Sequence, residues 1–230
     1  MNKVSFIIPT LNEFKRLRSC LLRLKGLHGE YEVIVVDGGS QDKTHSRSVG
    51  LVNAFIRSEQ GRALQMNVGA DKATGDILVF LHADTRVPEN VLSLIVDAME
   101  SGAAWGRFDV ELEGEAPMLK WIARMMNYRS AITHICTGDQ VMFMRQQVFK
   151  QVGGFPAIAL MEDIAISKLL KKIAKPYRIK ESVVSSGRRW EKSGVWRTIL
   201  LMWSLRLRYF FGTSPDKINR LYRNSHFFGS

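Results

Sequence analysis

The chain has few cysteines and no long apolar run. Only Cys20 and Cys136 occur among the 230 residues, and neither lies in a CxxC or Cys/His spacing. This scarcity excludes a disulfide framework and a structural zinc site, and it favours a reducing compartment. No stretch of about 18 uncharged apolar residues is present, so no membrane-spanning helix is predicted.

Several sequence signals are also absent. Neither GxGxxG nor GxxxxGK[ST] occurs, which excludes the common dinucleotide-binding and P-loop classes. Residues 1–5 lead directly into an apolar segment and lack the features of a secretory signal peptide, so we expect a cytoplasmic protein.

Basic residues exceed acidic ones. Lys and Arg number 33 against 22 Asp and Glu, which gives a net charge of +11. This charge favours anionic partners such as nucleotide phosphates, phospholipid surfaces or nucleic acid. With 46% apolar residues, the chain can form one globular domain with a short appendage.

Apolar strands alternate with amphipathic helices through the first hundred residues. Strands are predicted at 4–8, 32–36, 53–56 and 77–81, and helices at 14–24, at 62–73 and from Pro88. This alternation predicts an α/β fold whose mostly parallel sheet is covered on both faces. Residues 104–112 alternate between apolar and polar side chains, which predicts a half-exposed strand in a mixed or antiparallel part of the sheet.

Polar residues follow three of these strands, in segments 9–13, 37–42 and 82–84. The carboxyl ends of parallel strands are where α/β proteins bind ligands. Asp37 is suited to accept a hydrogen bond from a nucleobase, and Asp84 is suited to bind Mg²⁺ or Mn²⁺. Each aspartate taken alone is also compatible with a helix cap or a turn.

The chain resembles the family 2 glycosyltransferases through segments 8–13 (Ile-Pro-Thr-Leu-Asn-Glu), 36–40 (Val-Asp-Gly-Gly-Ser) and 82–84 (His-Ala-Asp). The resemblance implies a GT-A type fold, with a Rossmann-like, mostly parallel central sheet flanked by helices and a C-terminal helical tail. It also implies an inverting, metal-dependent transfer of a sugar from a nucleotide-diphosphate sugar to an unknown hydroxyl acceptor.

The resemblance assigns donor binding to residues of the strand-end loops and one helix. These are Pro9, Thr10, Asn12, Glu13, Asp37, Gly38, Arg62, His82, Ala83 and Asp84. Asp37 would bind the base, and Asp84 would bind the divalent cation, Mg²⁺ or Mn²⁺. His82 stands where a strict DxD motif has its first aspartate, so the number of protein ligands to the metal stays open.

The second half of the chain carries the implied catalytic and acceptor-side residues. An acidic pair follows the Gly-Gly-Phe turn at 153–155, and the resemblance makes Asp163 the catalytic base and Glu162 its orienting neighbour. A positioned carboxylate suits this role because the acceptor hydroxyl must lose its proton. By the same resemblance, contacts to acceptor or diphosphate fall to four further residues: Asp139, Arg188, Arg189 and Trp190.

The predicted organisation is a catalytic domain at 1–193 followed by an amphipathic, aromatic and basic helical tail at 194–230. The donor half covers about 1–103 and the acceptor half about 104–193. In the segment 194–212, aromatic and apolar residues are interleaved with Arg197, Arg206 and Arg208. This segment could lie on the inner face of the membrane and present the site to a lipid-linked acceptor, or it could pack on the catalytic domain or in a homodimer.

Two other functions account for part of the sequence. A nucleotidyltransferase would carry a Gly-rich loop after the first strand, but segment 9–13 contains no glycine. A basic nucleic-acid-binding module would account for the net charge. It would leave the acidic strand-end loops unexplained, so we do not expect a nucleic-acid partner.

Overall fold

The computed structural model describes residues 3–227; the side chains of Arg189, Ser193 and residues 225–227 lie outside that description. The strands are β1 (Val4–Thr10), β2 (Tyr31–Asp37), β3 (Ala54–Arg57), β4 (Ile77–Phe80), β5 (Trp105–Glu113), β6 (Met142–Arg145) and β7 (Tyr177–Ser186). The longer helices are α1 (Phe14–Lys25), α3 (Arg62–Lys72), α4 (Val91–Glu100), α5 (Met118–Thr133), α7 (Glu162–Leu170), α9 (Val195–Phe210) and α10 (Pro215–Phe227). Shorter ones are α2 (Thr44–Ser48), α6 (Gln146–Val152), α8 (Arg188–Ser193) and the 3₁₀ turn η1 (Gly138–Gln140).

The seven strands form one sheet in the order β3-β2-β1-β4-β6-β5-β7. β1 to β4 are parallel to one another, whereas β6 runs antiparallel to both β4 and β5. The predicted α/β class and mostly parallel sheet are therefore confirmed. Because β2 and β4 lie on opposite sides of β1, the strand order reverses there, and α/β proteins commonly bind ligands beyond the strand ends at such a point.

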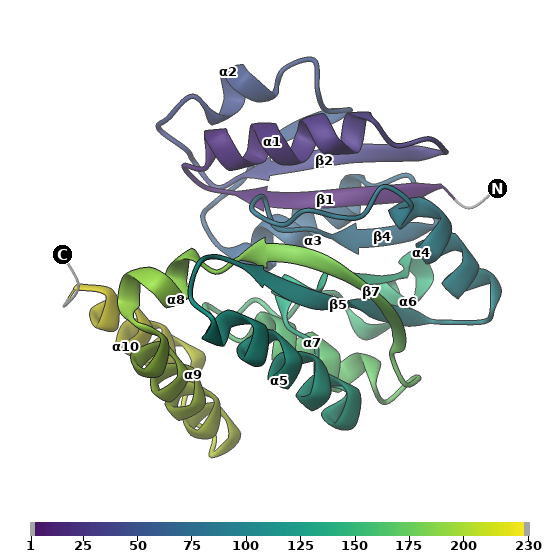
Figure 1. Ribbon diagram of the computed structural model, residues 1–230. Coiled ribbons are helices and arrows are strands. Elements are labelled where there is room, and N and C mark those ends of the chain that lie inside the picture. The colour runs from purple at the N-terminus through teal and green to yellow at the C-terminus, as the bar shows by residue number, and fades with distance from the viewer. Residues whose placement is uncertain (1–2, 228–230) are drawn as a thin grey trace.

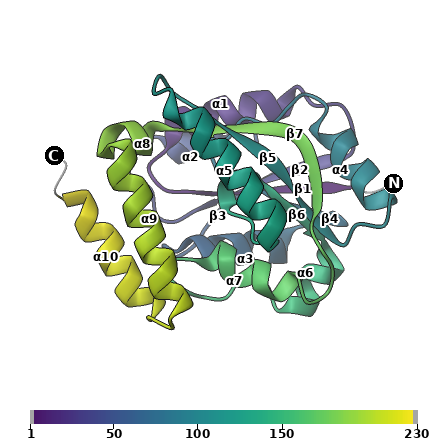
Figure 2. The same cartoon turned by 60° about the horizontal axis from the view of Figure 1, so that its bottom comes forward.

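Helices cover both faces of the sheet (Figures 1 and 2). α1 and α4 pack on one face through apolar side chains such as Leu21 and Ile95. α3, α6 and α7 pack on the other face through Met66, Phe149 and Ile166. Strands buried on both faces account for the continuous apolar runs in the sequence.

Two local predictions differ from the structure. The fourth helix begins at Val91 rather than at Pro88. The strand at 105–113 is not half exposed along its length, because Trp105, Arg107 and Asp109 are buried on the face predicted to be open. Arg107 and Asp109 form an ion pair there, and Arg178 forms a second ion pair with the same carboxylate at 2.7 Å. These pairs replace the solvation that the buried charges would otherwise need.

The C-terminal helices pack against the start of α7. Leu205 of α9 and Ile218 of α10 are buried against Met161 and Ile164 at the start of α7. α8, α9 and α10 stand on the side of the molecule at which β1 and β2 end (Figure 1). Within residues 3–227, no helix is long and apolar enough to cross a bilayer.

Candidate active site

The loops after β1 and β2 are joined by hydrogen bonds. The two strands are in register up to the pair Thr10 and Asp37, so their loops start level. The Gly38 N–H donates to the Thr10 carbonyl at 3.0 Å, and the Asn12 N–H donates to Ser40 Oγ at 2.8 Å. Asn12 has a φ of 53°, and its Oδ1 accepts from the Gln41 N–H at 2.9 Å. Two segments far apart in sequence thus form one rigid edge of the site.

Asp37 is fixed at the end of β2. Its side chain is 2% exposed and accepts hydrogen bonds from the Ser40 hydroxyl and the Ser40 N–H. Gln65 of α3 closes the same corner, because its Nε2 donates to the carbonyls of Thr10 at 2.9 Å and Val36 at 2.8 Å. Sequence reasoning missed Gln65. A buried glutamine on a helix gives no local signal of which strand ends it joins.

Two carboxylates lie near each other at the ends of β1 and β4. Burial raises the pKa of Glu13, and the nearby Asp84 raises it further. Glu13 also forms ion pairs with Arg16 at 3.7 Å and with Arg188 of α8 at 3.6 Å. Within the described chain, no hydrogen bond or ion pair engages the Asp84 carboxylate, which leaves it available to a cation.

His82, which follows β4, contacts the segment before β6. Its Nδ1 lies 3.6 Å from Asp139 Oδ1, and that oxygen also accepts from Ser185 Oγ at 3.1 Å. The imidazole packs directly on Gly138, where an added Cβ would lie 2.4 Å from ring atoms Cε1 and Nε2. The resemblance gave Asp139 and His82 separate roles, and the structure brings them together.

We expect Gly138→Ala to push the His82 ring away from the neighbouring loop. The overpacking should lower the free energy of unfolding by about 1–3 kcal/mol and should also lower turnover. Thermal unfolding and an activity assay check this. Gly26→Ala is the matched control, because its added Cβ would only meet the Arg23 carbonyl at 3.5 Å. Equal stability of the two variants would contradict the tight contact.

Asp163 is held at the N-terminus of α7. Its Oδ1 accepts from the Ile164 N–H at 2.7 Å, and its Oδ2 accepts from the Gly138 N–H at 3.2 Å. Burial raises the pKa of Asp163 to about 6, and the charge of neighbouring Glu162 acts in the same direction. A carboxylate with this pKa can take up a proton near neutral pH.

Glu162 forms an ion pair with α3. Its carboxylate is 5% exposed and lies 3.4 Å from Nη1 of Arg62, at the start of α3. Arg62 thus pairs with an acidic residue a hundred positions later in the sequence. The preceding residue, Met161, has a φ of 72°, and this left-handed turn directs the chain into α7.

Two residues of the C-terminal helices and one residue of α5 act on Asp163 or Arg62. Burial raises the pKa of Tyr209 in α9, and the charge of Asp163 raises it further. Tyr222 of α10 acts electrostatically on Arg62. Arg129 of α5 lies near Asp163, and within residues 3–227 its Nε and Nη2 are buried without a hydrogen-bond partner. Sequence reasoning missed all three, because no motif marks them.

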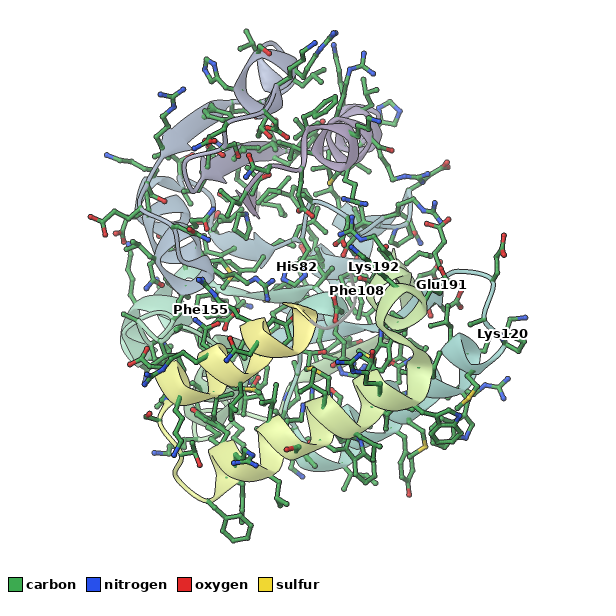
Figure 3. All side chains as sticks on the ribbon, turned by 90° about the vertical axis from the view of Figure 1, so that its left-hand side faces the viewer. His82, Phe108, Lys120, Phe155, Glu191 and Lys192 are labelled. Carbon is green, nitrogen blue, oxygen red and sulfur yellow. The ribbon has the colours of Figure 1, made fainter. Side chains whose placement is uncertain are left out.

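The remaining predicted site residues differ in their burial. Pro9 is half-buried at the end of β1, and Ala83 is buried after β4. Trp190 is half-buried on α8. The side chain of Arg189 lies outside the described part of the chain. Figure 3 looks at the side of the molecule on which α8, α9 and α10 lie, and it shows His82 and Lys192 above α9 and α10.

Known proteins share sequence and fold with this chain. The chain is 34% identical to the dolichol-phosphate mannosyltransferase of Pyrococcus furiosus over 111 residues, which are 44% of this chain and 31% of that protein. The chain thus spans about a third of the length of that relative.

Two solved structures share the fold. One is the mannosyltransferase PcManGT from Pyrobaculum calidifontis in complex with GDP-Man and Mn²⁺, with a TM-score of 0.65 and 20% identity over 98% of this chain and 70% of that one. The other is TarS 1–349 of S. aureus in complex with UDP-GlcNAc, with a TM-score of 0.64 and 18% identity over 81% of this chain and 58% of that one. The family model for glycosyl transferase family 2 matches residues 5–152, so the chain belongs to this family, and its fold is of the GT-A type.

Proposed function

We propose that the chain transfers a sugar from a nucleoside-diphosphate sugar to a hydroxyl acceptor, with inversion at the anomeric carbon and with Asp163 as the general base. The observation that carries this proposal is the Asp163 carboxylate, fixed by two backbone N–H groups and given a pKa of about 6 by burial and Glu162. The donor class is supported by two proteins of the same fold, TarS and PcManGT, whose structures are complexes with UDP-GlcNAc and GDP-Man.

In the proposed step, Asp163 takes the proton of the acceptor hydroxyl while that oxygen bonds to the anomeric carbon. The bond from this carbon to the diphosphate oxygen breaks, and its electron pair leaves with the nucleoside diphosphate. Arg62 pairs with Glu162 at 3.4 Å, which fixes the Glu162 carboxylate beside the base. The neighbouring Glu162 raises the pKa of Asp163.

The donor is assigned to the loops after β1, β2 and β4. Asp37 would accept from the nucleobase, and the Thr10 hydroxyl is a further contact because it is buried without a hydrogen-bond partner in the described chain. We assign the diphosphate side to Arg188 with Arg189, and the acceptor side to Asp139 and Trp190. The donor half then covers about 1–103, the acceptor half about 104–193, and the tail 194–230.

The residues present fit a divalent cation. The Asp84 carboxylate makes no hydrogen bond or ion pair in the described chain, and it lies close enough to Glu13 to raise the pKa of that residue. The described residues contain no cluster of three His, Cys, Asp or Glu side chains suited to a metal. Asp84 would therefore hold Mg²⁺ or Mn²⁺ together with oxygens of an anionic donor. When bound, such a cation would stabilise charge on the leaving diphosphate.

The test is a screen of UDP-, GDP- and TDP-sugars for Mn²⁺-dependent binding and hydrolysis. We expect one donor class to stabilise the chain thermally and to be hydrolysed slowly. Retention on heparin without thermal stabilisation by any nucleotide would favour the nucleic-acid-binding alternative instead. Once the acceptor is known, an α-linked product from an α-linked donor would contradict inversion.

The acceptor is proposed to be lipid-linked. The name of the dolichol-phosphate mannosyltransferase supports this class, and the aromatic tail beside the site is consistent with it. The chain would then work in the cytoplasm at the inner face of the membrane. Transfer assays with polyprenyl phosphate and with a water-soluble sugar acceptor distinguish the two acceptor classes.

A further inference from the structure

An exposed apolar stripe runs along α9. Trp196, Leu200, Trp203, Leu207 and Phe210 recur at helical spacing, and their side chains are 58–75% exposed. The opposite side of the same helix is the one that packs inward, with Thr198 and Leu205 buried. The helix therefore docks on the catalytic part of the chain without covering its aromatic stripe.

α5 carries a second stripe with the same spacing. Trp121, Met125, Tyr128 and Ile132 are 41–63% exposed, while Leu119, Ile122 and Ala123 are buried on its inner side. Ten of the sixteen exposed large hydrophobic side chains in the described chain lie in α5, in α9 or at adjacent Phe211. Isolated exposed apolar residues are common, but this concentration marks an interaction surface.

The two stripes belong to one surface. Trp121 at the start of α5 and Trp196 at the start of α9 line a single open groove, together with Pro117 and Met118. α5 and α9 lie on the same lower side of the molecule and face the viewer together in Figure 2. We call this surface, formed by the exposed residues of α5 and α9 with Phe211, the α5–α9 face.

The charge of the α5–α9 face has one sign. Its exposed basic residues are Lys120 and Arg124 on α5 and Arg197 and Arg208 on α9, and neither helix contains an acidic residue. Lys120 and Arg124 each directly precede a residue of the α5 stripe, and both are exposed. Basic side chains beside an apolar stripe can extend to lipid phosphates while the aromatic rings enter the headgroup boundary.

We propose that the α5–α9 face docks the protein on an anionic phospholipid bilayer. The apolar stripes would lie in the headgroup region, and the basic residues beside them would contact lipid phosphate. Arg188 on α8, which joins this face to the site, contacts Glu13 at 3.6 Å, so docking would hold the active site close to the bilayer surface. The docking itself does not depend on the identity of the sugar donor.

The experiment is co-sedimentation of the full chain with vesicles of phosphatidylcholine containing phosphatidylglycerol, and with pure phosphatidylcholine vesicles. We expect the chain to sediment with the anionic vesicles at low salt and to be released by high salt. Trp203→Ser and Tyr128→Ser should each weaken partitioning by about tenfold, the scale expected for removing one buried aromatic side chain. Tyr177→Ser is the matched control, because Tyr177 is 43% exposed on β7, outside the face.

Two results would overturn the proposal. The first is a chain that stays in the supernatant with anionic vesicles at low salt, or whose binding is equally weakened by the control. The second is a lipid-free dimer, detected by sedimentation velocity, that Trp203→Ser dissociates, since the face would then be a protein interface. Donor-nucleotide calorimetry on the same variants should be unchanged, which separates loss of docking from loss of fold or of transferase function.

Discussion

Asp163→Asn is expected to reduce turnover by about two or more orders of magnitude and to leave nucleotide binding in place. The amide cannot take the proton of the acceptor hydroxyl, and its single oxygen can keep only one of the two N–H bonds, from Ile164 or from Gly138, that the carboxylate accepts. Single-turnover transfer and nucleotide calorimetry measure the two quantities separately. Asp97→Asn, an exposed carboxylate on α4, is the matched control.

The pH dependence provides a second test of the same residue. The pKa of Asp163 is raised to about 6, so the wild-type rate should fall as pH decreases through that value and the base becomes protonated. The folded state binds this proton more tightly than the unfolded chain does, so the ionised carboxylate destabilises the fold above about pH 6. Asp163→Asn should therefore unfold at a higher temperature than the wild type at pH 8. A variant that transfers sugar at nearly the wild-type rate would place the base elsewhere.

The positions of the residues at the strand ends could be predicted from sequence because these residues follow strands with clear apolar patterns. Carboxyl ends of parallel strands meet at one edge, so Asp37 and Asp84 could be placed together before the structure was known. The hydrogen bonds that hold these strand ends together could not be predicted. Gln65 joins two strand ends across 55 and 29 residues, and nothing local to α3 indicates where its amide donates.

The surroundings of His82 and Asp163 were predicted less completely, because their contacts depend on the path of the whole chain. His82 meets Gly138 and Asp139 only because β6 runs antiparallel beside β4. Tyr209 and Tyr222 reach the site only because α9 and α10 fold back onto α7. The alternation in 104–112 was interpreted as a half-exposed strand, since a sequence pattern does not show that Arg107 finds a buried carboxylate partner.

Asp84→Ala is expected to remove the Mn²⁺-dependent part of nucleotide binding, a loss of at least about tenfold in affinity, or about 1.4 kcal/mol. No hydrogen bond or ion pair of the described chain engages this carboxylate, so the substitution should not unfold the protein. Asp84 raises the pKa of Glu13 by repulsion, and removing that repulsion should slightly increase the free energy of unfolding at neutral pH.

Calorimetry of nucleoside diphosphate with Mn²⁺ and with EDTA measures the effect of Asp84→Ala directly. The wild type should bind more tightly with Mn²⁺, and the variant should bind with the same weaker affinity in both conditions. Asp97→Ala removes an exposed carboxylate far from the strand-end loops and should retain the full Mn²⁺ effect, which separates metal binding from a general change in charge. An Asp84→Ala variant whose affinity still rises with Mn²⁺ as in the wild type would show that another group holds the cation. In that case Glu13 is the next carboxylate to test, because it is the acidic side chain that Asp84 acts on most directly at the ends of β1 and β4.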